Sequence, residues 1–195
     1  MGRPSARERK PYNMDSIVDV AVRVFLRRGY DGASLEQVAE AAGITKSSIY
    51  YHVAGKEDLL AHALGRALDV LFAVMNEPLA RDGEALARLQ YVVRRTVEVT
   101  VERLPEVALL LRVRGNTQTE RDALRRRRDF DQMVSRIMAE AQAHHQLRTD
   151  IDPRLATRMV FGMLNSITEW YRPDGRMGAA EIAQAAIRIA FEGLK

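Results

Sequence analysis

The segment 34-SLEQVAEAAGITKSSIYYH-52 decides the fold of this chain, and its first half predicts a short helix. Ser34 stands three residues before Gln37, which is the spacing of a capping box. Apolar residues then recur at helical intervals and give the helix one buried face. Gly43 can adopt the left-handed conformation that ends such a helix. The segment is therefore expected to begin with a helix and a tight turn.

The second half of the segment predicts another helix, whose side chains mostly face away from the protein. Thr45 is a candidate N-cap, and Ile49 is the one clear core anchor after it. Tyr50 and Tyr51 point about 100° apart on a helix, so they do not share one buried stripe. A polar second helix is typical of a helix-turn-helix, which inserts that helix into the DNA major groove. The competing interpretation is a helix-turn-helix pattern with core tyrosines and no DNA contact.

The expected roles at DNA divide between contacts that position the protein and contacts that read bases. Lysine, hydroxyl and aromatic side chains can meet base edges, which suits Lys46 and the residues that follow it. Phosphates are expected at Ser34, Tyr50 and Lys56, and at the backbone amides of the helix starts. The predicted DNA-binding residues are Ser34, Thr45, Lys46, Ser47, Ser48, Tyr50, Tyr51, His52 and Lys56.

The composition of the 195 residues excludes several classes of protein. There is no cysteine, which rules out disulfides, thiolate metal sites and cysteine nucleophiles. The N-terminus lacks the apolar stretch of a signal peptide, and no apolar run reaches the roughly 18 residues of a membrane span. We therefore expect a cytoplasmic protein with no membrane partner. The formal net charge of +4 is compatible with nucleic acid.

The rest of the chain is also expected to be helical, because strand alternation is absent. Periodicity and turn residues predict helices at about 13–29, 59–76, 83–103, 105–114, 118–145, 153–170 and 178–193. We expect an all-α fold with a three-helix helix-turn-helix DNA-binding domain at 13–58. A larger helical domain for effector binding and dimerisation would follow at 59–195. Residues 1–12 would form a flexible basic arm that follows DNA or stays a solvated tail, through Arg3, Arg7, Arg9 and Lys10.

In its N-terminal third the chain resembles the TetR family of transcriptional regulators. The matching features are Phe25 before Gly29-Tyr30, the segment 34–52, and the run Lys56-Glu57-Asp58-Leu59-Leu60. The resemblance implies a homodimer on a palindromic double-stranded DNA operator, released when a small molecule enters the C-terminal domain. Family members are mostly repressors. Val53 departs from the phenylalanine usual in the family and leaves a smaller plug after the second helix.

In the larger domain, a run of four arginines precedes an apolar helix face. Arg126 and Arg127 lie four and three residues before Phe130, so they share its buried side. Arginines beside an apolar region need an anionic partner, because burying an unpaired charge is costly. Pairing with Glu120, with Asp131 or with a neighbouring helix is one interpretation. Contact with an anionic ligand is the other.

Three segments of this domain, 127–130, 147–153 and 162–175, are similar to the TetR branch that senses acyl-CoA thioesters. Members of that branch control the breakdown of fatty acids, aromatic acids or sterol side chains. The resemblance implies an acyl chain in an apolar cavity and phosphates at arginines. Methionines suit an adaptable pocket, and equally serve as core filler. The predicted ligand-binding residues are Arg126, Arg127, Phe130, Met133, Val134, Met163, Asn165 and Trp170.

The last two predicted helices are expected to form the dimer interface, or alternatively an internal pair in a monomer. Small residues allow helices to approach closely, and apolar residues fill the space between them. The predicted interface residues are Leu155, Met159, Gly162, Ser166, Ala179, Ile182, Ala183, Ala186, Ile189 and Ala190.

Other functions compete with this interpretation. An enzyme is not expected, because no glycine-rich phosphate loop, nucleophile elbow or matched carboxylate pair stands out. The adjacent His144 and His145 diverge on a helix and cannot share a metal. We therefore expect no catalytic residues, cofactor or metal. A drug-sensing regulator of an efflux system would favour an aromatic pocket, whereas aromatics make up only 6% of the chain. An effector-independent DNA-binding protein is a further alternative.

Overall fold

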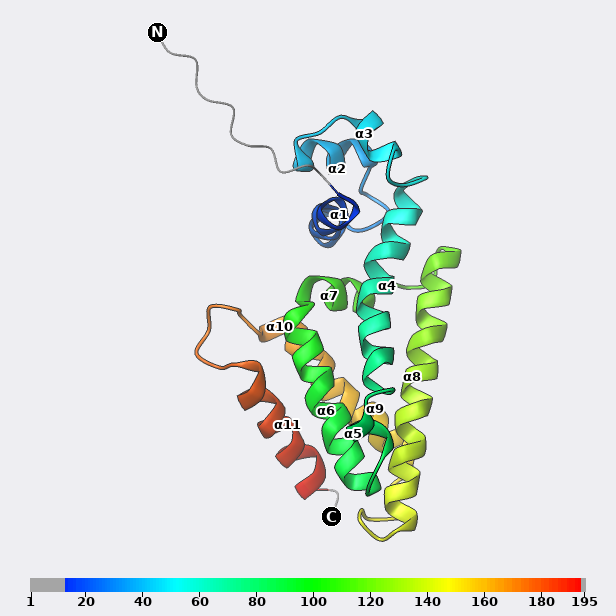
Figure 1. Cartoon of the computed structure of the whole chain (residues 1–195), viewed down its shortest axis with the longest axis vertical. Coiled ribbons are helices and arrows are strands. Elements are labelled where there is room, and N and C mark those ends of the chain that lie inside the picture. The colour runs from blue at the N-terminus through cyan, green and yellow to red at the C-terminus, as the bar shows by residue number, and fades with distance from the viewer. Residues whose placement is uncertain (1–12, 194–195) are drawn as a thin grey trace. The chain divides into compact units, whose positions relative to one another are not determined.

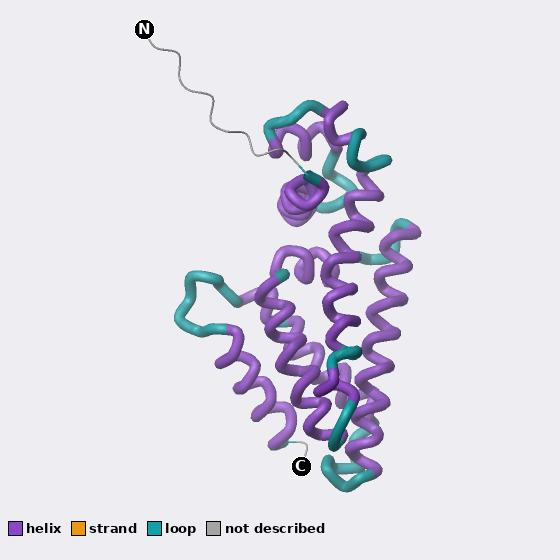
Figure 2. The backbone as a smooth tube through the Cα atoms, in the orientation of Figure 1, coloured by secondary structure: helices purple, strands orange, loops and turns teal. Residues whose placement is uncertain are grey.

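The computed structural model describes residues 13–193, and the predicted basic arm lies outside them. Every regular element in this range is a helix, which confirms the all-α prediction (Figure 2). The chain divides into two compact units, residues 1–63 and 64–195. Helix α4 (Lys56–Val74) begins in the first unit and ends in the second (Figure 1). None of the helices between residues 13 and 193 is long and apolar enough to cross a membrane.

The first unit combines the start of α4 with three helices, α1 (Met14–Arg28), α2 (Leu35–Ala42) and α3 (Lys46–Tyr50). A side-chain cap precedes each of the three: Asn13, Ser34 and Thr45 accept hydrogen bonds from backbone N–H groups of the first turn. Such caps satisfy donors that have no partner within the helix. Gly43 ends α2 with φ at 69°, in the left-handed region that favours glycine. The predicted helix, turn and second helix are therefore present.

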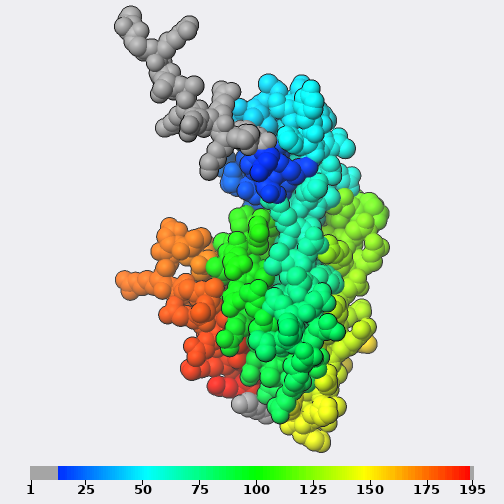
Figure 3. Space-filling view, in the orientation of Figure 1, coloured from blue at the N-terminus to red at the C-terminus, as the bar shows by residue number. Residues whose placement is uncertain are grey.

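The second unit contains the rest of α4 and seven further helices among the described residues. They are α5 (Pro78–Arg81), α6 (Ala85–Glu102), α7 (Leu104–Arg112), α8 (Gln118–Ala143), α9 (Pro153–Asn165), α10 (Ile167–Trp170) and α11 (Ala179–Glu192). Helix α6 is central, because all six of the others pack against it. Its apolar face, including Leu89, Val92 and Val97, is fully buried in one continuous core. Figure 3 shows the loop between α10 and α11 standing out from this unit.

Two predictions for this unit need correction. No helix was predicted over 78–81, where α5 forms with Pro78 at its first position, and there the missing N–H of proline costs nothing. The helix predicted over 153–170 breaks at Ser166 into α9 and α10. The Ser166 and Thr168 hydroxyls donate to the carbonyls of Met163 and Asn165, at 2.7 and 2.9 Å. These side-chain bonds compete with the helical ladder at that point.

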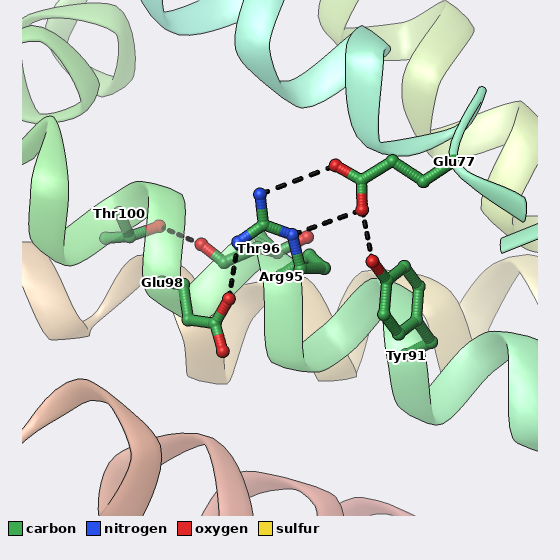
Figure 4. A network of polar contacts seen from close by, with 6 residues as sticks. All are labelled: Glu77, Tyr91, Arg95, Thr96, Glu98 and Thr100. Atoms are coloured by element: carbon green, nitrogen blue, oxygen red, sulfur yellow. Dashed lines mark hydrogen bonds and ion pairs between the residues drawn. The ribbon is translucent and has the colours of Figure 1, made fainter. Parts of the chain in front are cut away.

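A polar network ties the turn before α5 to α6 (Figure 4). The Glu77 carboxylate accepts from the Tyr91 hydroxyl and, at 3.3 Å, from Arg95 Nε. Arg95 also donates to Glu98 one turn along the same helix. The Tyr91 and Arg95 hydrogen bonds hold the pKa of Glu77 below its usual value. This network fixes one side of α6, next to residues of that helix that line a cavity.

Candidate DNA-binding surface and effector cavity

Helix α3 has one anchoring side chain and an otherwise open surface. Ile49 is fully buried, whereas Tyr51 is 89% exposed and Tyr50 is 52% exposed. Ser47 and His52 are exposed as well. The expectation that the two tyrosines do not share the core is confirmed. The surface they form is available to a partner, and their DNA contacts remain predictions.

Lys46 forms an ion pair with Glu36, a contact that was not predicted from the sequence. Its ammonium group donates to Glu36 of α2 and lies 5.9 Å from the centre of the Tyr50 ring. The hydrogen bond from Lys46 lowers the pKa of Glu36, and both side chains are largely exposed. For Lys46 to reach a base edge, this ion pair must open.

Three predicted DNA contacts already serve as helix caps or cap partners. The Ser34 hydroxyl accepts from Gln37 N–H at 3.3 Å, and the Thr45 hydroxyl accepts from Ser48 N–H at 3.2 Å. The Thr45 and Ser48 hydroxyls also lie 2.8 Å apart. These groups therefore fix the helix starts, whose free amides are the kind of group that binds phosphate.

Lys56 has a structural role in addition to the predicted phosphate contact. Its ammonium group donates to the carbonyls of Tyr30 and Ala33 at 2.9 Å each, and to that of Asp31 at 3.4 Å. It also lies 4.4 Å from the centre of the Tyr30 ring. Because three carbonyls engage its donors, Lys56 clamps the α1–α2 loop to the start of α4. A phosphate contact would require the ammonium to leave at least one of them.

The second unit contains a cavity of about 220 Å³ whose walls come from five helices. Its lining is mainly apolar, with a polar group on several sides. The lining residues are Leu68, Leu71, Thr96, Thr100, Val107, Leu110, Leu111, Arg127, Phe130, Asp131, Arg158, Phe161, Gly162 and Asn165. Three predicted ligand-binding residues, Arg127, Phe130 and Asn165, are among them.

The other five predicted ligand-binding residues do not line this cavity. Arg126 instead pairs with Asp69 of α4 at 2.7 Å and lies 5.1 Å from the centre of the Phe72 ring. Trp170 is 45% exposed, in α10. The helical period places Val134, Met133 and Met163 in or against the core rather than at the cavity. For Arg126 the expected pairing with an acid on a neighbouring helix is confirmed.

Arg127 and Asp131 form the polar wall of the cavity on α8, one turn apart. Burial lowers the pKa of Arg127 and raises that of Asp131, and their opposite charges offset part of both effects. Arg158 of α9 also favours the charged form of Asp131. Glu120 takes no part, because its carboxylate accepts backbone N–H groups of the α7–α8 loop. Arg127 therefore lies near a protein acid, Asp131, and also lines the cavity.

The predicted ligand-binding residues include none from α4, α6 or α7, and they omit Arg158 of α9. Thr96 and Thr100 lie one turn apart on α6, and the Thr100 hydroxyl donates to the Thr96 carbonyl at 2.7 Å (Figure 4). The Thr96 hydroxyl is buried without a hydrogen-bond partner in residues 13–193. A polar residue within an apolar helical stripe, as at Thr96 and Thr100, was the available signal. Arg158 had none, because it reads as an ordinary exposed position.

The predicted dimer residues separate into two groups. Leu155, Met159 and Ile189 are exposed, Met159 by 69%. Four others are buried within the chain because α11 packs on α6, so the prediction that they face a partner was wrong: Ile182, Ala183, Ala186 and Ala190. The small residues on α11 permit close approach to α6. Gly162 of α9 and Ser166, the C-cap of α9, are exposed along the same face as Leu155 and Met159, and Ala179 is half-buried.

Between residues 13 and 193, no cluster of three or more histidine, aspartate or glutamate side chains could hold a metal ion.

Comparison with known protein families gives a match in each of the two units. A family model described as bacterial regulatory proteins of the tetR family matches residues 17–63. A second, described as the tetracyclin repressor-like C-terminal domain, matches residues 82–194.

Individual proteins match over nearly the whole chain. SCO3833, a member of the TetR transcriptional regulator family from Streptomyces coelicolor A3, is 55% identical, with a TM-score of 0.87 over 96% of this chain and 93% of that chain. The HTH-type transcriptional repressor KstR2 of Rhodococcus jostii (strain RHA1) is 26% identical over 91% of this chain and 89% of its own. AibR, solved with isovaleryl coenzyme A and operator DNA, shares the fold, with a TM-score of 0.78 and 23% identity over 91% of this chain and 97% of that chain. This chain belongs to the TetR family of transcriptional regulators.

Proposed function

We propose that this regulator is a homodimeric repressor that binds a palindromic operator and is released by an acyl-CoA thioester. The observation that carries the proposal is that one chain has both an exposed surface on α3, which we assign as the recognition helix, and a largely apolar cavity lined in part by arginine. DNA binding resides in the first unit and ligand binding in the second. Binding of the effector therefore lowers the affinity for DNA at a separate site, and the size of this change is the coupling free energy between the two sites.

Support for operator binding comes from the surface of α3. Its open side carries a lysine, hydroxyls and two tyrosines, which can donate to base edges or pack on thymine methyl groups. Ser47, Tyr51 and His52 are exposed and free of the capping roles found for their neighbours. We assign base contacts to these three and to Lys46, and phosphate contacts to Tyr50 and the amides beside Ser34 and Thr45.

Support for a thioester effector comes from the cavity and from the relatives. Seven of the fourteen lining residues are aliphatic or phenylalanine, which suits an acyl chain, and Arg127 adds a positive charge to the wall. The cavity volume of about 220 Å³ offers room for a short acyl group. AibR, of the same fold, has been solved with isovaleryl coenzyme A.

Support for a homodimer comes from an exposed stripe of apolar and small residues along α9 and its C-cap. Leu155, Met159, Gly162 and Ser166 recur at intervals of four, three and four residues and are all exposed. Ile189 of α11 is exposed as well. A two-fold axis would set this surface against its own copy, and the two recognition helices would then read the two halves of a palindrome.

The proposal is tested by fluorescence anisotropy with labelled DNA from upstream of the protein's own gene, at fixed salt. Salt must be fixed because phosphate contacts make the affinity strongly salt-dependent. The bound complex is titrated with acyl-CoA thioesters from isovaleryl- to octanoyl-CoA, and with free CoA. We expect release by one class of thioester and not by free CoA.

The other results would overturn parts of the proposal. Tight DNA binding that no thioester disturbs would remove the acyl-CoA assignment and redirect the search to drugs. DNA binding with little sequence preference and no response to any small molecule would indicate an effector-independent protein. A monomer by light scattering at the concentrations that saturate the operator would remove the dimer.

A further inference from the structure

A second hollow, of about 560 Å³, lies between α8 and α9, and we call it the α8/α9 groove. Ten residues line it: Arg128, Asp131, Gln132, Ser135, Arg136, Ala139, Pro153, Arg154, Thr157 and Arg158. On α8 they fall at helical intervals along one side, and that side faces α9. Four of the ten are arginines, and one is an acid.

The arginines of the α8/α9 groove lack the acidic partners that several other arginines of this unit have. Arg88 pairs with Glu140 at 2.8 Å, and Arg126 pairs with Asp69 at 2.7 Å. None of the four groove arginines forms an ion pair with a residue in the described range. Four arginines and one aspartate leave a formal charge of +3 within the groove. Such a concentration of one sign attracts an anion.

The α8/α9 groove and the cavity adjoin, because Asp131 and Arg158 line both. Along α9, Arg154 lines only the groove, and Phe161 lines only the cavity one turn beyond Arg158. These positions follow one another on the same side of the helix, at intervals of four and three residues. A single elongated ligand can therefore lie along α9 with an apolar end in the cavity and an anionic end in the groove.

We propose that the α8/α9 groove binds the phosphates of the effector's nucleotide portion while the cavity holds the acyl group. The inference rests on the proposed function and deepens it, since it assigns the CoA phosphates to particular arginines outside the acyl cavity. Guanidinium groups suit phosphate because they donate two hydrogen bonds in one plane. The phosphate role expected of Arg126 then passes to Arg128, Arg136, Arg154 and Arg158.

The test uses two double variants that remove the same charge. Arg136→Gln with Arg154→Gln alters the groove at exposed residues that do not line the cavity. The control is Arg81→Gln with Arg94→Gln, two exposed arginines outside both hollows. Neither pair breaks an ion pair with a residue between 13 and 193. A difference between the variants therefore reports position rather than net charge or folding.

Binding of the tightest thioester in the isovaleryl- to octanoyl-CoA series is measured by calorimetry, beside its 3′-dephospho form and its pantetheine thioester. For the wild type we expect affinity to fall in that order. The groove variant should bind the CoA thioester at least about tenfold more weakly, whereas the control stays within about twofold. The pantetheine thioester, which has no phosphate to place in the groove, should bind the wild type and the groove variant equally.

Other outcomes overturn the inference in distinguishable ways. Equal affinities of the groove and control variants would remove the phosphate site and leave the acyl-CoA effector intact. No binding of any CoA thioester to the wild type would remove the proposed effector itself, and the site with it. A groove variant that weakens operator affinity without ligand, or that changes the oligomeric state, would assign the groove to DNA or to a partner chain.

Discussion

The two units recognise their targets with surfaces of different construction. In the first unit, the predicted DNA-binding residues come from one stretch of chain, 34–56, and most of them are exposed. In the second unit, the cavity is lined from α4, α6, α7, α8 and α9, by side chains that mostly also contribute to packing. Substitutions at the exposed residues of the first surface that have no capping role should therefore change binding alone, whereas those around the cavity should also change stability.

The largest expected effect is on the stability of the second unit. The buried Glu120 carboxylate accepts from the N–H groups of Arg114, Gly115 and Asn116 at 3.2, 2.7 and 2.8 Å. Glu120→Ala leaves these donors without their acceptor and should lower the free energy of unfolding by about 3 kcal/mol. Urea unfolding followed by circular dichroism measures this. Glu102→Ala, at an exposed acid of α6, is the control, and a similar small loss in both would refute the anchoring role.

The second effect is on DNA binding without a change in stability. Tyr51→Ala removes the most exposed side chain of the recognition surface and should weaken operator binding by about 30-fold, or ~2 kcal/mol. The free energy of unfolding should change by less than about 0.5 kcal/mol, because surface substitutions rarely do more. Fluorescence anisotropy and urea unfolding measure the two quantities. Leu79→Ala, which removes an exposed side chain of α5, is the control. A monomeric Tyr51→Ala protein would contradict the division between the units.

Lys56 is where the contrast between the units is least sharp. Lys56→Met removes the three bonds to the α1–α2 loop and should lower the free energy of unfolding by about 1.5 kcal/mol. A phosphate contact would in addition weaken operator binding and reduce the slope of log affinity against log salt by about one. Urea unfolding and anisotropy at several salt concentrations separate these contributions. Unchanged stability together with a reduced slope would leave only the phosphate role.

Thr96 tests whether the cavity wall is optimised for stability. Its buried hydroxyl has no partner within residues 13–193, so Thr96→Val should raise the free energy of unfolding by about 1 kcal/mol. Thr100→Val is a matched control with the opposite sign, since it breaks the 2.7 Å bond to the Thr96 carbonyl. Thermal unfolding without ligand measures both. If Thr96→Val destabilises the protein, then the hydroxyl is satisfied by water.

The two units also differ in how much of their structure could be predicted from the sequence. The caps at Ser34 and Thr45 and the turn at Gly43 depend on residues three or four apart, so local rules were sufficient. The ion pair between Glu36 and Lys46 spans ten residues and depends on the angle between two helices, which local rules do not provide.

In the second unit, periodicity identified the helices and the buried side of α8. Periodicity did not show that Arg126 forms an ion pair with Asp69, or that Arg158 lines the same cavity as Arg127. Both depend on how distant helices pack. The same limit explains Ile182, which the apolar pattern placed correctly on a buried face. The pattern could not distinguish burial against α6 from burial against a partner.

The smallest effect concerns the ion pair beside the recognition surface. The Glu36 carboxylate engages Lys46 and adds a negative charge close to where phosphates are expected. Glu36→Gln frees the ammonium and removes the repulsion, so operator affinity should rise by about threefold at low salt and by less at high salt. Glu40→Gln, one turn along α2 and exposed, removes the same charge without freeing Lys46 and should have the smaller effect. Anisotropy at two salt concentrations measures this. Weaker binding by Glu36→Gln would mean that Glu36 orients Lys46 for DNA. One DNA contact of the first unit would then depend on the packing of two helices, as the lining of the cavity does in the second unit.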